Sequence, residues 1–275
     1  MKQKILISIS AVVLGLITYG VGEAQTAATK SYQQMSPTEQ ANFVEEQARS
    51  IARQMSGAEY QFTPAFEMEI QRSIDEYVKR LGNNAGDRPG KGDARFVFDR
   101  GRTLAPTLTA IFRSRNISTL IGLYLPLIES EYLNNPGVSS MGAVGMFQFL
   151  PATGKRYGLT RQDLWSAEKS ADAAARYISD SISTFAEDPM KEALALLAYN
   201  RGGENVLRDL ALIVDDKNRQ CSICALTAAR AKLDPTFQDE NVHYVPRFFA
   251  AAIIGENPQA FGLPMQPLSS YERKL

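Results

Sequence analysis

Residues 120–132 read Leu-Ile-Gly-Leu-Tyr-Leu-Pro-Leu-Ile-Glu-Ser-Glu-Tyr, an apolar run that ends in two carboxylates. Apolar residues on every side of a helix predict a helix that is buried in a protein core. Glu129 is the first charged side chain of this run. At the end of a buried helix its carboxylate would lose solvation, which raises the pKa and suits a general acid. From this position alone, an exposed glutamate at a helix end is the simpler interpretation.

A series of short motifs follows Glu129 in one order. They are Glu129-Ser130, Asn135-Pro136, Ser139, Gly142-Ala143-Val144-Gly145-Met146-Phe147-Gln148, Pro151-Ala152-Thr153-Gly154 and Ala198-Tyr199-Asn200-Arg201-Gly202-Gly203. Their order resembles the transglycosylase SLT domain, the goose-lysozyme-like catalytic module of lytic transglycosylases. The resemblance covers residues 120–211. It extends to residues 103–128, Tyr244-Val245-Pro246 and Asn257-Pro258, which look most like the membrane-bound lytic transglycosylase D subgroup.

The chain departs from the family pattern at three places. One extra residue stands between Glu129-Ser130 and Asn135-Pro136, Phe147 stands where the family often has Met or Trp, and residues 215–240 look inserted. The extra residue makes the position of Ser139 relative to Glu129 uncertain. The insertion would reshape the cleft or form a surface for a partner.

The resemblance implies a reaction that needs one carboxyl group. Glu129 would protonate the oxygen of the β-1,4 bond between N-acetylmuramic acid and N-acetylglucosamine, and would then accept the proton of the C6 hydroxyl of N-acetylmuramic acid. That hydroxyl closes onto C1 and leaves a 1,6-anhydro sugar, so no second base is required. Glu131 lies about 200° from Glu129 around a helix, and we expect it to be a solvated charge.

The same resemblance supplies a set of substrate-binding residues. They are Ser139, Gly145, Met146, Gln148, Tyr199, Asn200 and Tyr244. Glycines allow a tight turn and the close approach of a sugar, and the amide of Gln148 can both donate and accept hydrogen bonds. The family implies that Tyr199 holds the carboxyl group of Glu129 and that Tyr244 is a second active-site tyrosine. Without the family, the glycines and Gln148 would be a structural turn, and Tyr199 with Asn200 would be a helix end.

Helical periodicity extends over the rest of the chain. Ser36-Pro37-Thr38-Glu39 and Thr63-Pro64 predict two helix starts, and Gly82 is placed to end the second helix. Further helices are predicted over residues 101–112, 120–132, 172–185, 190–199 and 245–255, whereas no segment shows sustained alternation. The expected fold is mainly α, a lysozyme-like SLT domain preceded by amphipathic packing helices. We expect a signal peptide at 1–24, an N-terminal helical segment and linker at 25–100, the transglycosylase domain at 101–265 and a tail at 266–275.

The overall charge argues against nucleic acid as a partner. The 275 residues include 30 basic and 30 acidic side chains, and 44% are hydrophobic. Phosphate binding needs an excess of Lys and Arg, so a neutral polymer fits better. Lys2 and Lys4 precede an apolar run to about Val21, which predicts an export signal cleaved after Ala24 and a periplasmic protein. If it stayed uncleaved, the segment would be a membrane anchor.

Cys221 and Cys224 form a lone CxxC motif. In an oxidising compartment we favour a small disulfide over free thiols. His243 is the only histidine, so the ligand set falls short of a structural zinc site, and we expect neither a metal nor a cofactor.

Two other functions remain open from the sequence. One is a binding scaffold for peptidoglycan that has lost the chemistry, and the other is a lysozyme-type hydrolase of the same fold. Peptidoglycan glycan strands are the expected partner in each case. Cell-wall or secretion-machinery proteins are further candidate partners.

Overall fold

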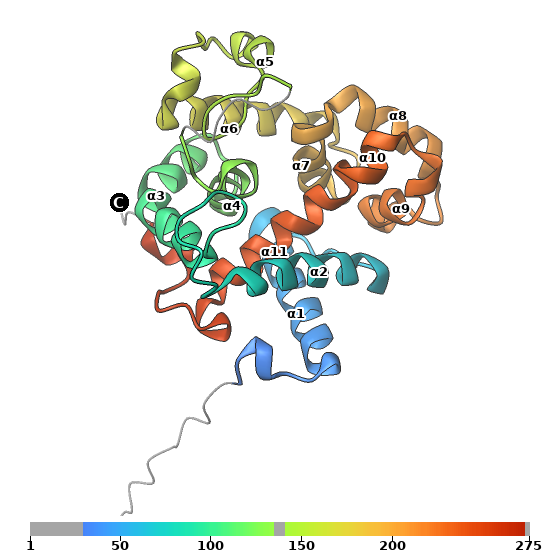
Figure 1. The fold of residues 1–275 in the computed structure, drawn as a ribbon. Helices are drawn as coiled ribbons and strands as arrows, with labels where there is room; N and C mark the ends of the chain where they lie inside the picture. Colours follow the sequence, from blue (N-terminus) through green and yellow to red (C-terminus); the bar gives the residue numbers. More distant parts are fainter. Residues whose placement is uncertain (1–29, 135–140, 273–275) are drawn as a thin grey trace, which may run out of the picture.

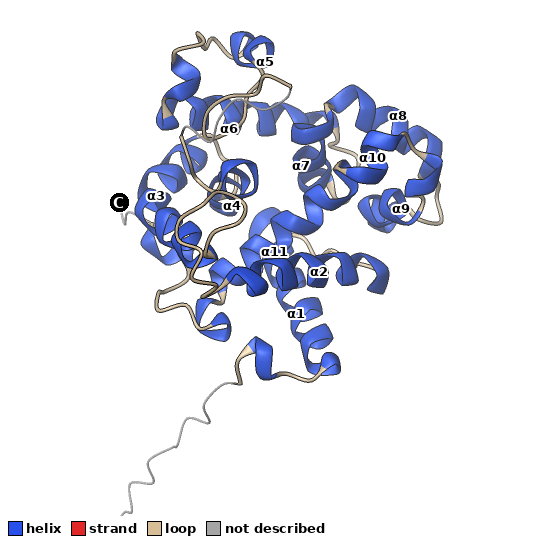
Figure 2. Ribbon diagram, viewed as in Figure 1, coloured by secondary structure: helices blue, strands red, loops and turns tan. Residues whose placement is uncertain are grey.

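The computed structural model describes residues 30–134 and 141–272. The predicted signal peptide and Ser139 lie outside these residues. The helices are α1 (Pro37–Ser56), α2 (Pro64–Arg80), α3 (Ala94–Ser114), α4 (Thr119–Ser130), α5 (Pro151–Arg156), α6 (Ala167–Thr184), α7 (Lys191–Arg201), α8 (Gly203–Ile213), α9 (Ser222–Ala228), α10 (Pro235–Asp239) and α11 (Tyr244–Glu256), with short 3-10 turns between some of them. Figure 2 shows helices and loops in this part of the chain, where the only extended pairing is a bridge between Val144 and Phe149. The predicted mainly α fold is confirmed.

The two N-terminal helices begin where the sequence predicts. Ser36 accepts a hydrogen bond from the backbone N–H of Glu39, and the Glu39 side chain accepts one from the backbone of Ser36. The side chain of Thr63 likewise accepts from the N–H of Phe66. These caps satisfy N–H groups that the first helical turn leaves unpaired, so each helix start is fixed locally.

The apolar helix α4 lies in the middle of the molecule (Figure 1). It contacts α3, α11 and α1, and residues 120–128 are buried. The helix ends at Ser130, two residues earlier than predicted, because Glu131 and Tyr132 both adopt left-handed backbone conformations with φ of 53° and 63°. The side chain of Glu131 therefore takes a different direction from the one that a continuous helix would give it.

Two helices begin several residues earlier than the sequence predicts. Helix α3 begins at Ala94 rather than at residue 101, because Asp93 caps it by accepting the N–H of Arg95. The Asp93 carboxylate also accepts the N–H of Gly82, and this links the ends of α2 and α3. Helix α6 begins at Ala167 rather than at residue 172, because the Ser166 side chain caps it through the N–H of Lys169.

The N-terminal helices share one hydrophobic core with the rest of the chain. Helices α1 and α2 both pack against α11, and buried side chains of all three belong to the same cluster. Residues 215–240 fold into short helices that include α9 and α10, and a disulfide joins Cys221 to Cys224. Among the described residues, no helix combines the length and apolarity required to cross a bilayer.

Candidate active site

A cavity of about 820 Å³ opens beside the C-terminal end of α4. Three parts of the chain form its walls: α2 with the following loop, the last turn of α4, and residues 239–247. Its lining residues are Arg72, Ser73, Glu76, Tyr77, Arg80, Pro89, Gly90, Leu127, Ile128, Glu129, Ser130, Glu131, Asp239, Glu240, His243 and Arg247. Helix α2 therefore forms one wall of the cavity that contains Glu129.

Glu129 occupies the last turn of α4 and is partly buried. Burial raises the pKa of its carboxyl group from 4.5 to about 7, because the charged form loses solvation. A hydrogen bond from Tyr244 and the positive charge of Arg247 act in the opposite direction, and the negative charge of Glu240 adds to the increase. A carboxyl group with this pKa is able both to donate and to accept a proton near neutral pH.

Tyr244 holds the carboxyl group of Glu129. It is the first residue of α11, it is buried, and its phenol donates a hydrogen bond to Glu129 Oε1. Burial, together with the Glu129 charge, raises the pKa of this phenol well above 10, so it stays a donor. One turn further along α11, Arg247 Nη2 donates to the carbonyl oxygen of Ile128 at 3.0 Å. The start of α11 thus contacts the end of α4 twice, once at the acid itself and once at the residue before it.

Tyr199 has a different partner from the one that the sequence suggests. Its hydroxyl donates to the carbonyl oxygen of Phe147 at 2.8 Å, whereas Tyr244 donates to Glu129. Edge-on contacts with Phe149 and Tyr177 fix the ring of Tyr199 in this direction. Burial, together with the negative charge of Glu129, raises the pKa of the Tyr199 phenol well above 10.

The glycine-containing loop after α4 is held together by its own polar groups. Gly145 has φ of 77°, and a Cβ atom there would lie 2.0 Å from the carbonyl oxygen of Leu164. Met146 is buried, and its carbonyl oxygen accepts the hydroxyl of Ser130 at 2.7 Å. The amide of Gln148 donates to the carbonyl oxygen of Gly145 at 2.8 Å. Gly145 therefore permits close approach of the chain to itself, and Gln148 braces the loop from within.

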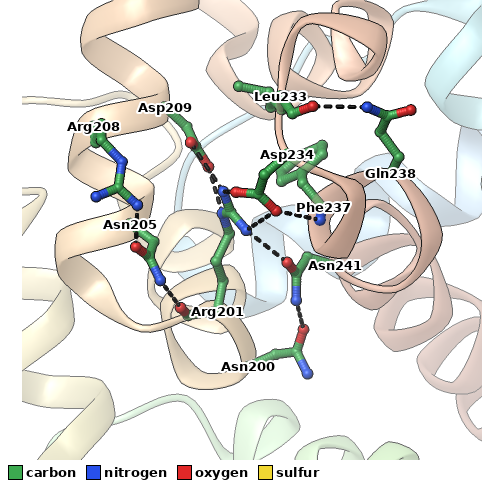
Figure 3. Close-up of polar contacts among 10 residues, drawn as sticks. All are labelled: Asn200, Arg201, Asn205, Arg208, Asp209, Leu233, Asp234, Phe237, Gln238 and Asn241. Carbon is green, nitrogen blue, oxygen red and sulfur yellow. Dashed lines mark hydrogen bonds and ion pairs between the residues drawn. The ribbon is translucent and has the colours of Figure 1, made fainter.

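Asn200 connects the end of α7 to the chain before α11. Its Oδ1 accepts from Asn241 at 2.6 Å, and its Nδ2 donates to Glu240 at 3.2 Å. Figure 3 shows the neighbouring Arg201 at the centre of a larger network.

The buried guanidinium of Arg201 joins three segments of the chain. It pairs with Asp209 of α8 and with Asp234, and it donates to Asn241 Oδ1 at 2.9 Å. Asp234 in turn caps α10 through the N–H of Phe237. This network fixes residues 234–241, and hence one edge of the cavity, against α7.

Glu131 is not the solvated charge that the sequence suggests. Its side chain is 14% exposed and lines the same cavity as Glu129. Arg80 Nη1 lies 2.7 Å from its Oε1, and the N–H of Gly90 donates to its Oε2 at 3.1 Å. The expectation was wrong because it assumed a helix that continues past Ser130. Both carboxylate oxygens are engaged, so Glu131 fastens the loop after α2 to the end of α4.

The cavity residues of α2 were missed by sequence reasoning altogether. Arg72, Tyr77 and Arg80 lie about 50 residues before Glu129 in the chain, and helical periodicity predicts only that α2 packs against something. In the described part of the chain, no cluster of three or more His, Cys, Asp or Glu side chains is arranged to hold a metal ion.

The sequence of the chain matches one known protein family. The model of the Transglycosylase SLT domain family matches residues 113–220, a range that includes Glu129, the Gly145 loop and Tyr199. The chain therefore contains an SLT transglycosylase domain, and proteins with this domain are generally lytic transglycosylases that act on peptidoglycan. No curated protein matches the chain. Tyr244, Arg247 and the whole of α2 lie outside the matched range.

Proposed function

We propose that the protein is a lytic transglycosylase that cleaves the β-1,4 bond between N-acetylmuramic acid and N-acetylglucosamine and forms 1,6-anhydro-N-acetylmuramic acid. The observation that carries this proposal is Glu129, a carboxyl group of raised pKa at the end of a buried helix, which accepts a hydrogen bond from Tyr244 and lines a cavity of about 820 Å³. The SLT match supports the substrate class.

The first step needs a protonated acid. With a pKa of about 7, a large fraction of Glu129 carries its proton at neutral pH, and it would transfer this proton to the glycosidic oxygen. As the bond breaks, positive charge develops at C1 of the muramic acid ring. The carboxylate left on Glu129 then faces that charge, while Tyr244 keeps its hydrogen bond and limits the movement of the carboxylate.

The second step returns the proton to Glu129. The carboxylate accepts the proton of the C6 hydroxyl, whose oxygen bonds to C1 and closes the anhydro ring. Because the nucleophile belongs to the substrate, the reaction needs no carboxylate to activate water. Glu131, the other carboxylate beside Glu129 at the end of α4, has both oxygens engaged by Arg80 and Gly90, which suits anchoring rather than base catalysis.

Digestion of purified cell-wall sacculi tests this assignment. The wild type should release soluble fragments whose muramic acid ends are lighter by one water than hydrolysed ends. Glu129→Gln keeps the shape of the side chain and removes the titratable carboxyl group, so the rate should fall at least about 100-fold. Glu187→Gln changes an exposed glutamate between α6 and α7 and should keep the full rate.

The alternatives give different products. Hydrated ends would identify a lysozyme-type hydrolase, and binding to sacculi without release of fragments would identify a scaffold. Either result contradicts the proposal, as does full activity in Glu129→Gln.

We also propose a location and a subgroup. Lys2, Lys4 and the apolar run that follows support export to the periplasm through a cleaved signal peptide. Tyr244-Val245-Pro246 and Asn257-Pro258 support the membrane-bound lytic transglycosylase D subgroup. Retention of the chain in the cytoplasm after expression with its own N-terminus would contradict the first of these.

A further inference from the structure

The loop between α2 and α3, residues 81–93, forms part of the cavity wall. Pro89 and Gly90 are exposed, and both line the cavity that contains Glu129. The loop lies outside residues 113–220, so it belongs to the part of the chain that the SLT match leaves out. A proline ring presents C–H groups, and a glycine lets a ligand approach the backbone closely. This stretch is therefore suited to pack against the C–H face of a sugar ring.

Hydrogen bonds within the loop hold its two ends together. The carboxylate of Asp93 accepts the N–H of Gly82 at 2.9 Å, and the N–H of Asp93 donates to the carbonyl oxygen of Gly86 at 2.9 Å. The part that lines the cavity is held in a different way. The N–H of Gly90 donates across to α4, to Glu131 Oε2 at 3.1 Å. The position of the lining residues therefore depends on Glu131.

Glu131 also binds the base of the loop through Arg80. Arg80 Nη1 lies 2.7 Å from Glu131 Oε1, while Arg80 Nε donates to the carbonyl oxygen of Gly92 at 3.0 Å. On the other side, Arg100 Nε donates to the carbonyl oxygen of Glu131 at 2.8 Å. The Nη2 atoms of Arg80 and Arg100 are buried and have no hydrogen-bond partner among the described residues. The Glu131 carboxylate is thus the anion that holds Arg80, and with it the loop, against α4.

The acid and this anchor share one end of α4. Glu129 lies in the last turn, and Glu131 is the residue that ends the helix, with its N–H donating to the carbonyl oxygen of Leu127 at 2.9 Å. The path from Glu129 to the lining residues is therefore short: two residues of chain and one hydrogen bond. A wall connected in this way keeps a fixed position relative to the acid.

We propose that Glu131 is a positioning residue for the reaction, which holds Pro89 and Gly90 in place to bind a sugar ring of the glycan strand in the cavity of Glu129. This inference rests on the proposed function, since it concerns how the substrate of that site is held. Glu131 transfers no proton in this account. Its loss should therefore weaken binding of the strand and leave the chemical step intact, a change in KM rather than in kcat.

Initial rates of the full chain on soluble, uncross-linked peptidoglycan strands test the inference. Anhydro ends are counted by mass, and kcat and KM are determined separately. Glu131→Ala should raise KM about fivefold, because the strand then has to order the loop when it binds. The alkaline limb of the pH profile should stay at about 7, since burial, Tyr244, Arg247 and Glu240 set the pKa of Glu129. A residue that only supported folding would instead lower kcat through a smaller folded fraction, at an unchanged KM.

Two substitutions at Arg80 test the same contact from the other side. Arg80→Gln removes the ion pair with Glu131 and should raise KM about fivefold as well. Arg80→Lys keeps a positive charge that can pair with Glu131, so it should recover part of the loss. Asp99→Asn is the matched control. It removes an exposed ion pair with Arg102 on α3, and neither residue lines the cavity, so both kcat and KM should stay the same.

The contact with the sugar has its own test. Pro89→Ala shortens the apolar surface of the loop and leaves Glu131 and Arg80 unchanged, so KM should rise about two- to fivefold. Hydrogen exchange of the free protein reports the anchor directly. In Glu131→Ala the amide of Gly90 loses its acceptor, and the loop should exchange faster than in the wild type, whereas the amides of α6 should not.

An unchanged KM in both Glu131→Ala and Arg80→Gln overturns the inference, as does a fall in kcat alone, and either result leaves the proposed function standing. If Glu131→Ala does not fold, Arg80→Gln and Pro89→Ala decide the matter. An unchanged KM in Pro89→Ala means that the loop does not contact the strand, which also contradicts the inference. If the wild type releases no anhydro ends, the proposed function itself is wrong, and the inference falls with it.

Discussion

Glu129 owes its chemistry to the balance between burial and two neighbours. Burial raises the pKa of its carboxyl group to about 7, and without Tyr244 and Arg247 the pKa would be higher still. The hydrogen bond from the Tyr244 phenol favours the charged form, because it is stronger to a carboxylate than to a neutral acid. The tyrosine therefore has two effects, fixing the position of the carboxyl group and lowering the pH at which it loses its proton.

This balance predicts the pH dependence of the reaction. The first step uses protonated Glu129, so kcat/KM should fall as the pH rises through about 7. Tyr244→Phe removes the hydrogen bond that lowers the pKa, so the rate should decrease while the alkaline limb of the profile moves to higher pH. Initial rates on sacculi at constant ionic strength, measured from pH 5 to about 9, would show this.

A matched control is available for this experiment. Tyr157 donates to Asp180 at 2.9 Å and does not line the cavity. Tyr157→Phe should leave the limb in place. A shift of the Tyr244→Phe limb to lower pH would show that the hydrogen bond does not act on Glu129 as described.

Local sequence signals predicted the starts of α1 and α2 correctly, because Ser36 and Thr63 cap them with side chains that lie next to the helix. The end of α4 could not be predicted in this way. Glu131 adopts φ of 53° although it is not a glycine, and what holds it there are Arg80, Gly90 and Arg100, which are distant in sequence. Contacts between residues that are distant in sequence produce no pattern in the sequence around Glu131. The prediction that Glu131 is a solvated charge was wrong for this reason.

The loop after α4 carries a prediction of its own. Gly145 packs so closely on the segment before α6 that a Cβ atom would lie 2.0 Å from the Leu164 carbonyl oxygen, and its φ is 77°. Gly145→Ala should therefore cost about 2–4 kcal/mol in the free energy of unfolding, from overpacking and left-handed strain together. Gly142 also has a positive φ of 81°, but among the described residues no atom lies within 4 Å of its Cβ position.

Gly142→Ala is thus the control. It introduces backbone strain without overpacking, and it should lower the free energy of unfolding by about 1 kcal/mol. Urea denaturation followed by circular dichroism gives both values. An equal decrease in the free energy of unfolding for the two variants would mean that the chain around Leu164 moves aside without an energetic cost.

At the scale of the whole molecule, the sequence predicted the fold class, Glu129 as the candidate acid and, through the family resemblance, Tyr244 as an active-site tyrosine, but it did not predict that α2 lines the cavity. The motifs from Glu129 to Asn200 all lie within the residues that the SLT model matches. Their order led to the prediction that Tyr199 is the partner of the acid. Tyr244, which donates to Glu129, lies 115 residues further along the chain. Side chains of α2 form another wall of the cavity. These are tertiary contacts, and only the folded chain brings them together.

The same contacts predict that residues 113–220 do not fold alone. That fragment lacks α1, α2 and α11, and it keeps only the end of α3, so the surface of α4 that they cover would face water. In α11 alone, Phe248, Phe249, Ile253 and Ile254 are fully buried, and their burial contributes on the order of 10 kcal/mol, as much as the net stability of a typical domain. The fragment should therefore show no cooperative thermal transition and no release of anhydro ends. Residues 30–272, which keep all of these helices, should unfold in one cooperative transition and retain activity. A 113–220 fragment that melted cooperatively and cleaved sacculi would show that neither folding nor catalysis requires α2 and α11.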